Sequence, residues 1–450
     1  MFTQLPFRAL LIVGALALLG WAPLSTAVAM DWEIESFDRL VLWFGDGVSI
    51  AVDQDGNPYI AHDVSLEGMI HFAFRGPEGW VIEAVDDYYS SGGGSAVALD
   101  ASGTPCIVYG DGNPDIEPVV LTFARRTPSG WEREAVDQMR YDSHVALRFR
   151  SDGLAVIAYS AEGGGQLKYA SQTAGGSWDV EIADAVPASG CDMSLVLDEN
   201  DDPHLCHWES TSGRPRQVYT CRKDGLWLRH ILDAVGMCNA MGSGIDVDGQ
   251  GKVHIAWQIH ECESPGALYY AKLSEAGSST AKVDSDFSFY SAGCSLVVDR
   301  LGRPHILYGT QGQLVGGPSE LRYAHLDEEG KWVHELVDDD GDCGEINAVT
   351  IDADGFLHVA YYAGDGSTQF GVIRYARSAT PVAPPPLPGD LDCDGMVNAF
   401  DIDPFVLALT DEAAYAAEFP TCDYMAADTN QDGEVNVFDV DPFVALLTGS

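Results

Sequence analysis

The chain has 450 residues, of which 69 are acidic and 24 are lysine or arginine, so its formal net charge is -45. This charge excludes nucleic acid and anionic membranes as partners, because no basic stripe is present to replace the counterions of their phosphates. It favours solubility and attracts divalent cations. The length allows one large domain and one small domain.

Residues 1–29 have the pattern of a secretory signal peptide. Arg8 precedes the apolar run ALLIVGALALLG, and a stretch of small residues ends at Ala29. The run is too short to span a bilayer comfortably, and no later segment has the roughly 18 apolar residues that a membrane span needs. We therefore expect a secreted or cell-surface protein that is cleaved after Ala29, in which disulfide bonds can form.

Residues 30–378 repeat one pattern seven times. Each copy has two alternating apolar runs around a short turn, which is typical of a β-hairpin. The turn is Asp-x-x-Gly in most copies, and its anchor positions are 47 to 53 residues apart, at Asp53, Asp100, Arg150, Asp198, Asp248, Asp299 and Asp352. A nearly constant period of this length indicates a repeat architecture.

Each copy continues with a third apolar run and a fourth that usually begins with tryptophan. Four short antiparallel strands per copy are typical of one blade of a β-propeller. The seventh copy lacks its fourth strand, whereas an unmatched strand begins at Trp32. We predict an all-β, seven-bladed propeller in which this N-terminal strand completes the last blade, so that no sheet edge remains unpaired.

Several repeated residues are expected to be structural. A histidine recurs at one register of the second strand, at His204, His254, His305 and His358. Because a catalytic site needs one copy of each group, we interpret these side chains as packing and hydrogen-bonding elements. The anchor aspartates are expected to accept N–H groups of their own turns, and the tryptophans to fill the wedges between blades.

Candidate ligand-binding residues lie on the longer loops, which share the face opposite the short turns and sit on a rigid scaffold. The side chains that could stack on a sugar ring are Tyr88, Tyr89, Tyr141 and His260. The carboxylates near the mouth of the central channel are Asp46, Asp142, Asp192 and Glu345. Two of them could act as acid and base on a glycosidic bond, or all could form a solvated acidic rim. Catalytic residues therefore stay unassigned.

In its architecture, the predicted propeller resembles secreted bacterial propellers with sialidase-like and lectin-like repeats, and its own repeat is D-x-x-G-x-P-H. This repeat departs from the Asp-box of sialidases, and clustered arginines for a sialate carboxylate are missing, so sialidase activity is not expected. Of the cysteines in the propeller, we expect Cys206 and Cys221 to pair, because they lie on adjacent predicted strands.

A proline-rich linker, residues 379–389, precedes two copies of one acidic sequence that are 38 residues apart. Written as twelve-residue loops, the copies place oxygen ligands at positions 1, 3, 5, 7, 9 and 12, and glycine at position 6 permits the sharp turn. The predicted ligands are Asp390, Asp392, Asp394, Met396, Asn398 and Asp401, then Asp428, Asn430, Asp432, Glu434, Asn436 and Asp439, with Met396 and Glu434 acting through their carbonyls. The pattern predicts two calcium ions.

Each loop leads into a predicted helix, with an N-cap at Asp403 or Asp441 and a proline directly after it. Duplicated loop-helix units with aspartate at position 12 resemble a type I dockerin over residues 389–450. The resemblance implies a small all-α calcium-binding domain, residues 390–450, that docks to a cohesin-like module. At the pair used for cohesin recognition, often Ser-Thr, this sequence has Ala-Phe and Val-Phe. Cys393 and Cys422 could staple this small domain.

We expect a secreted calcium-binding protein whose propeller binds a carbohydrate or another surface ligand and whose C-terminal module docks it to a partner. The sequence favours a binding protein over an enzyme. Two alternatives stay open, a polysaccharide-degrading glycoside hydrolase and a purely structural cell-surface protein.

Overall fold

The computed structural model describes residues 30–448, with gaps at 42–46, 65–68, 87–93, 113–118, 141–143, 162–164, 187–188, 210–214, 233–236, 262–265, 275–276, 288–292, 312–318, 328, 365–369, 384–386, 394–395 and 420–421. For some residues beside these gaps, the backbone is described and the side chain is not. The expected signal peptide, residues 1–29, lies outside the described residues.

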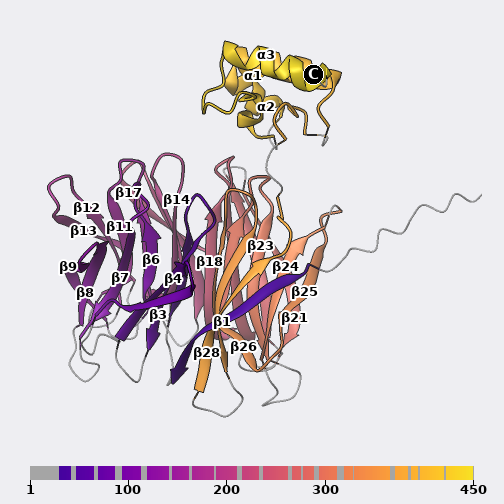
Figure 1. Ribbon diagram of the computed structural model, residues 1–450. Coiled ribbons are helices and arrows are strands. Elements are labelled where there is room, and N and C mark those ends of the chain that lie inside the picture. Colours follow the sequence, from indigo (N-terminus) through magenta and orange to yellow (C-terminus); the bar gives the residue numbers. More distant parts are fainter. Residues whose placement is uncertain are drawn as a thin grey trace, which may run out of the picture.

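The described chain forms seven four-stranded antiparallel sheets, arranged as blades around a central axis (Figure 1). From the innermost strand outward, blades one to three are β2 (Val48–Val52), β3 (Pro58–Val64), β4 (Met69–Gly76) and β5 (Gly79–Ala84); β6 (Ala96–Leu99), β7 (Pro105–Asp111), β8 (Val119–Thr127) and β9 (Gly130–Met139); and β10 (Val145–Phe149), β11 (Ala155–Ser160), β12 (Leu167–Gln172) and β13 (Trp178–Asp184). Blades four to six are β14 (Ser189–Leu197), β15 (Pro203–Glu209), β16 (Arg216–Lys223) and β17 (Leu226–Ile231); β18 (Met237–Val247), β19 (Val253–Glu261), β20 (Gly266–Ser274) and β21 (Gly277–Phe287); and β22 (Cys294–Val298), β23 (Pro304–Gln311), β24 (Ser319–Leu326) and β25 (Trp332–Asp338).

The two ends of the propeller sequence together build blade seven. Its strands are β26 (Asp342–Ile351), β27 (Leu357–Gly364), β28 (Phe370–Ser378) and, outermost, β1 (Trp32–Val41). Trp32 pairs with Ser378 at one end of β1, and Val41 pairs with Phe370 at the other. The prediction of seven blades closed by the N-terminal strand is therefore confirmed.

In four of the blades, the repeated histidine belongs to a chain of polar contacts between an aspartate and a tyrosine. In blade five, Asp248 accepts the N–H groups of Gln250 and Lys252 at 3.0 and 2.9 Å, as expected for an anchor aspartate. Its other oxygen lies 3.1 Å from Nε2 of His254, and Nδ1 of His254 lies 2.7 Å from the Tyr270 hydroxyl. The same chain recurs around His204, His305 and His358. These contacts support the structural interpretation of the histidines.

Tryptophans of the outer strands pack between blades, as predicted. Trp131 lies edge-on to Phe72 of the preceding blade, with ring centroids 5.2 Å apart. Trp332 meets Tyr270 in the same way, also at 5.2 Å. Edge-to-face pairs of this kind add to the stabilisation that comes from burying the rings.

A second recurring contact joins neighbouring blades through an aspartate near the end of most of the described outer strands. Asp338 follows a β-bulge in β25 and accepts hydrogen bonds from Tyr361 at 2.7 Å and Arg374 at 2.6 Å, both in blade seven. A bulge of this kind re-aims the side chain beside it. Tyrosines bind the equivalent carboxylates in the pairs Tyr109 with Asp86, Tyr159 with Asp137 and Tyr308 with Asp284. We call these aspartates the junction aspartates.

A small helical region follows the propeller. Its elements are η1 (Ala399–Asp401), α1 (Ile402–Thr410), α2 (Glu412–Glu418), η2 (Tyr424–Ala427), η3 (Val437–Asp439) and α3 (Val440–Thr448). Phe405 of α1 stacks on Phe443 of α3 with ring centroids 3.9 Å apart, so equivalent residues of the two sequence copies form the core. Cys393 and Cys422 form the expected disulfide.

Two expectations are wrong. The helical turns start before Asp403 and Asp441, because Asn398 and Asn436 cap them: in the first copy, the Asn398 side chain accepts the N–H of Phe400 at 2.9 Å. The prolines still fall in the first turns of α1 and α3. The pairing of Cys206 with Cys221 does not occur, because both are free thiols and the strand register places them opposite Tyr219 and His204, respectively.

The start of the linker lies against the short turns of blades six and seven. The Val382 N–H donates to the Gly355 carbonyl at 2.8 Å, and Arg303 donates to the Val382 carbonyl. Gly355 has a φ of 85°, and a Cβ there would lie 1.9 Å from the Ala383 carbonyl oxygen, so the contact requires glycine. The helical region accordingly lies on the side of these turns (Figure 1). None of the helices in the described part of the chain has the length and apolar character needed to cross a membrane.

The buried hydrogen-bonded chains can be tested at His254, which is fully buried. Burial lowers the pKa of His254 to about 4, so the neutral ring donates to Asp248 and accepts from Tyr270. We predict that His254→Ala destabilises the fold by about 2 to 4 kcal/mol, because it leaves a cavity and two polar groups without this partner. Urea unfolding measures the loss. Lys331→Ala, in an exposed ion pair, is the control and should cost less than about 1 kcal/mol; equal effects would contradict the prediction.

Candidate functional site

The first acidic loop brings its carboxylates together. One oxygen each from Asp390, Asp392 and Asp401 lies within 4.8 Å of the others. Asp390 is 7% exposed and Asp401 is fully buried. Asp394, the predicted ligand at position 5, lies outside the described residues.

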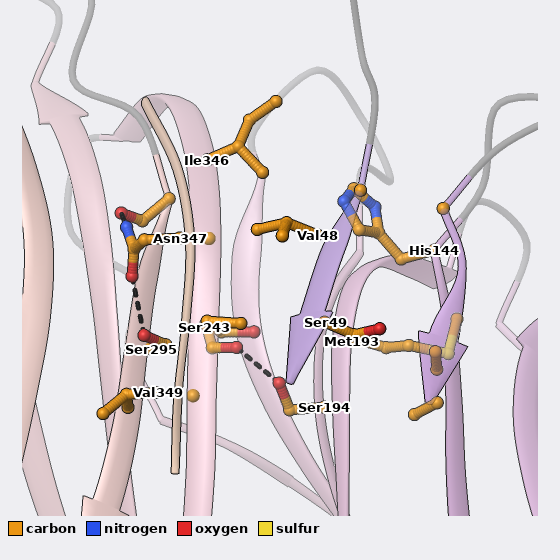
Figure 2. A pocket seen from close by; sticks show the side chains of 18 of the residues that line it. Val48, Ser49, His144, Met193, Ser194, Ser243, Ser295, Ile346, Asn347 and Val349 are labelled. Atoms are coloured by element: carbon orange, nitrogen blue, oxygen red, sulfur yellow. Dashed lines mark hydrogen bonds between the residues drawn. The ribbon is translucent and has the colours of Figure 1, made fainter. Parts of the chain in front are cut away.

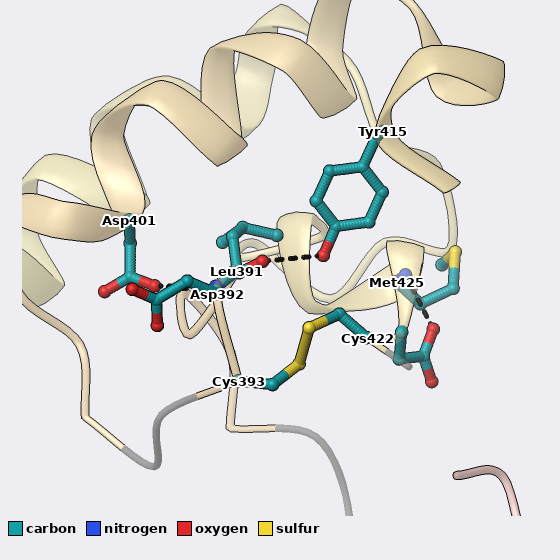
Figure 3. Close-up of a disulfide and its surroundings, with 8 residues drawn as sticks. Leu391, Asp392, Cys393, Asp401, Tyr415, Cys422 and Met425 are labelled. Atoms are coloured by element: carbon teal, nitrogen blue, oxygen red, sulfur yellow. Dashed lines mark hydrogen bonds between the residues drawn. A yellow bond between two sulfur atoms is a disulfide. The ribbon is translucent and has the colours of Figure 1, made fainter. Parts of the chain in front are cut away.

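Backbone N–H groups hold the closing carboxylate of this loop in place. Asp401 accepts the N–H groups of Leu391 at 2.6 Å and Asp392 at 3.1 Å through one oxygen, and that of Asn398 at 2.8 Å through the other. The Tyr415 hydroxyl donates to the Leu391 carbonyl at 3.0 Å. The disulfide between Cys393 and Cys422 lies beside this segment of the loop (Figure 3). The loop is thus preorganised by the helices around it.

The second loop repeats this arrangement. Asp439 is fully buried and accepts the N–H groups of Asn430 at 3.1 Å and Asn436 at 2.8 Å. Asp428 is 7% exposed and accepts the N–H of Asp432 at 3.1 Å and of Gly433 at 2.8 Å. Gly433 has a φ of 90°, which is the conformation that favours glycine at position 6.

The donor set of both loops suits a hard divalent cation. In the first loop, three carboxylates bring their oxygens close to one point. The side chains of Met396 and Glu434 are exposed, as expected for residues that act through their carbonyls. Buried carboxylates that face one another repel and are costly unless a cation compensates them. The residues present therefore fit calcium. Asp390, Asp392, Asn398, Asp401 and the Met396 carbonyl, with their counterparts in the second loop, would hold it. Bound calcium would neutralise the loop and fix its shape.

The described part of the propeller also has a central channel of about 310 Å³, lined by the innermost strands of all seven blades. Hydroxyl and amide groups form hydrogen bonds between neighbouring strands of its wall (Figure 2). Ser194 donates to the Ser243 carbonyl at 2.7 Å, and Ser295 donates to the Asn347 side chain at 2.6 Å, each across a blade boundary. The wall therefore combines these polar groups with aliphatic side chains such as Val48, Met193 and Ile346.

Of the carboxylates predicted near the channel mouth, the structure places Glu345 in the lining. Asp46 and Asp142, as well as Tyr88, Tyr89 and Tyr141, lie outside the described residues, and so do the side chains of Asp192 and His260. The lining also includes His144 and Arg148, which sequence reasoning missed. At the equivalent positions most other copies have small or apolar residues, and blade four has Asp192 opposite His144 in the alignment while blade five has Asp246 opposite Arg148, so a closer alignment of the copies could have found them.

Charges in the channel are perturbed by its walls. Glu345 is exposed to the channel, yet burial among the surrounding walls raises its pKa, and nearby Asp342 adds to the effect. On the inner strand β18, burial raises the pKa of Asp246 to about 6, although it accepts the N–H groups of Val298 at 2.7 Å and Val247 at 2.9 Å. Burial lowers the pKa of Arg148, and the Asp246 charge partly offsets this.

Comparison with known proteins assigns the chain to no family. No family model matches the chain, and no curated protein matches it. An ulvan lyase from a new polysaccharide lyase family is 12% identical, the match covers 77% of this chain and 94% of that chain, and the TM-score is 0.48. An α-L-arabinanase from Penicillium chrysogenum is 10% identical, with 76% and 98% covered and a TM-score of 0.45. A lectin from Aleuria aurantia is 11% identical, with 66% and 97% covered and a TM-score of 0.45.

The acidic loops can be tested at their closing carboxylates. We predict that Asp401→Ala and Asp439→Ala each abolish binding of one calcium ion, because position 12 closes the coordination sphere. Isothermal titration of the chain from residue 30 onward, after chelation, counts the ions. Asp403→Ala and Asp441→Ala remove exposed acidic residues from the same helices and should leave the count unchanged. An unchanged count in the first two variants would refute these ligand assignments.

The raised pKa of Asp246 predicts how the stability of the fold changes with pH. Because the folded pKa is raised from 3.8 to about 6, the folded state binds more protons than the unfolded state between these values, and stability falls as pH rises through this window. Asp246→Asn removes this fall, so its stability relative to the wild type should increase from about pH 4 to about pH 7. Melting temperatures across this range measure the difference. Asp55→Asn, at an exposed turn, should run parallel to the wild type; a parallel Asp246→Asn curve would contradict the assignment.

Proposed function

We propose that this is a secreted, calcium-binding attachment protein. Its C-terminal region would be ordered by two calcium ions and dock to a partner, while the propeller binds a carbohydrate. The observation that supports this most strongly is the convergence of Asp390, Asp392 and Asp401 around one point, with the same backbone geometry at the second loop. Export would follow from the signal-like residues 1–29.

The docking surface of this proposal is apolar. Phe400 and Phe438, directly after position 10 of each loop, are 75% and 73% exposed, and Val437 is 71% exposed. Exposed aromatic side chains on a rigid element are typical anchors of protein interfaces. The partner is therefore a cohesin-like module with an apolar recognition surface in place of one that reads Ser-Thr. The two sequence copies present equivalent faces, so either one could dock.

The propeller would offer its other face to the ligand. The linker occupies the side of the Asp-x-x-Gly turns, which leaves the face where outer strands return to inner strands. Hydroxyls, amides, His144 and Glu345 around the channel suit the hydroxyl groups of a sugar. Among the described lining residues, Glu345 is the one carboxylate, so a hydrolase with paired carboxylates gains no support here. The carbohydrate-named propellers matched above are too distant to identify the ligand.

Two independent binding activities test the proposal. We predict that docking to a panel of cohesin modules requires calcium and is lost in a Phe400→Ala/Phe438→Ala double variant, because both faces lose their anchor. Binding of the same chain to a glycan array should persist in chelator and weaken in His144→Ala. Surface plasmon resonance and the array give the two readouts.

Matched variants separate the outcomes. Single Phe400→Ala should retain docking through the second face, and Leu226→Ala, at a 67% exposed side chain of β17, should change neither activity. Docking that is unaffected by chelation would refute the calcium-dependent attachment. Absence of saturable glycan binding would refute the carbohydrate ligand and leave the attachment to be judged by the first readout alone.

A further inference from the structure

The junction between blades seven and one differs from the other described junctions. Elsewhere a junction aspartate meets a tyrosine or histidine of the next blade, and in four cases also a lysine or arginine: Arg133 at Asp86, Lys168 at Asp137, Arg229 at Asp184 and Arg374 at Asp338. At the ring closure, the junction aspartate is Asp38 of β1, and it faces two histidines of blade one, His62 of β3 and His71 of β4.

Three strands place these side chains around one point. Oδ2 of Asp38 lies 3.2 Å from Nε2 of His62 and 2.8 Å from Nδ1 of His71. A register shift in β1 beside Asp38 turns its carboxylate towards blade one. His62 and His71 are cross-strand partners on one face of the sheet, with ring centroids 5.4 Å apart. One ligand atom from each of the three residues therefore lies within 4.8 Å of the others.

We propose that Asp38, His62 and His71 form a binding site for a divalent transition metal such as zinc. Two imidazole nitrogens and a carboxylate oxygen are a common ligand set for these metals, with a further position for water. Neighbouring ligand atoms on a tetrahedral zinc lie about 3.3 Å apart, given Zn–N and Zn–O bonds of about 2.0 to 2.1 Å. The observed separations from Asp38 differ from this by at most about 0.5 Å, so small side-chain shifts admit the ion.

The charges of the junction favour a metal over a purely hydrogen-bonded contact. At Asp137 and Asp338, a lysine or an arginine supplies the positive charge that compensates the junction aspartate. At Asp38, the equivalent strand position is His71, an imidazole that offers a lone pair to a metal. A divalent ion bound there supplies the compensating charge and uses both imidazoles.

Exposure of the cluster allows an ion to enter. His62 is 1% exposed, whereas the side chains of Asp38 and His71 are 14% and 17% exposed, so the site reaches the surface on one side. Next to the cluster, Phe37 stacks on Trp80 with ring centroids 4.2 Å apart, and Glu35 forms an ion pair with Arg75 at 2.7 Å. These contacts hold β1 against blade one. The metal joins β1 to β3 and β4 and so fastens the closure of the ring.

Zinc titration of the chain from residue 30 onward tests the proposal. Calcium in excess is kept present to occupy the C-terminal loops, whose oxygen ligands prefer it. We expect one saturable zinc ion per chain and a rise in melting temperature of a few degrees with zinc, since binding to the folded state alone stabilises it. Cobalt(II) in place of zinc should give visible bands of a site with nitrogen ligands.

Variants copied from the other junctions keep the fold while removing the ligands. His62→Tyr/His71→Arg recreates the tyrosine and arginine found at Asp338, so the ring should close, with unchanged circular dichroism, and zinc binding and the zinc-dependent melting shift should be lost. His207→Tyr alters the single histidine at Asp184, and zinc binding should persist. Undiminished zinc binding in the double variant, or no saturable zinc in the wild type, would overturn the proposal.

Discussion

The closure of the propeller depends on the antiparallel pairing of β1 with β28. Blade seven is complete because nine residues of β1 find partners from Trp32 to Val41. Without that strand, β28 would expose an unpaired edge, which is a template for association with other chains. The side chains of β1 add contacts to blade one, through Phe37 on Trp80 and Asp38 on the two histidines. The first strand of the domain therefore joins its last blade to its first.

Repeated residues maintain the scaffold, and non-repeated residues carry what is specific to this protein. The anchor aspartate, the histidine and the tyrosine recur in four blades, where they link the turn between the first two strands to the third strand. Positions where one copy breaks the pattern have no such structural reason. His144 and Arg148 in the channel, and His71 at the closure, are positions of this kind. Departures from the repeat are thus a better guide to function than the repeat itself.

The sequence predicted the elements that local pattern determines. Period, turns and the missing strand predicted the number of blades and their closure, because six of the blades form from contiguous residues and the seventh visibly lacks one strand. The caps at Asp403 and Asp441 were misplaced because the calcium-type loop ends in a capping box of its own, with Asn398 and Asp401 in reciprocal hydrogen bonds. The pairing of Cys206 with Cys221 failed for a similar reason, since adjacency of strands does not determine register. The contacts between blades, such as Asp38 with His71, join residues far apart in the sequence, and no local pattern indicates them.

The distribution of charge links the two ends of the molecule. With 69 acidic and 24 basic residues, the chain has far fewer lysines and arginines than carboxylates, and four of the described junction aspartates receive one. Backbone N–H groups compensate the anchor aspartates and the closing carboxylates of the acidic loops. Where several carboxylates meet, or where a junction aspartate meets imidazoles instead of a fixed cation, hydrogen bonds leave negative charge in a poorly solvated place. The metal ions proposed for the strand that closes the propeller and for the C-terminal acidic loops would supply positive charge at these places.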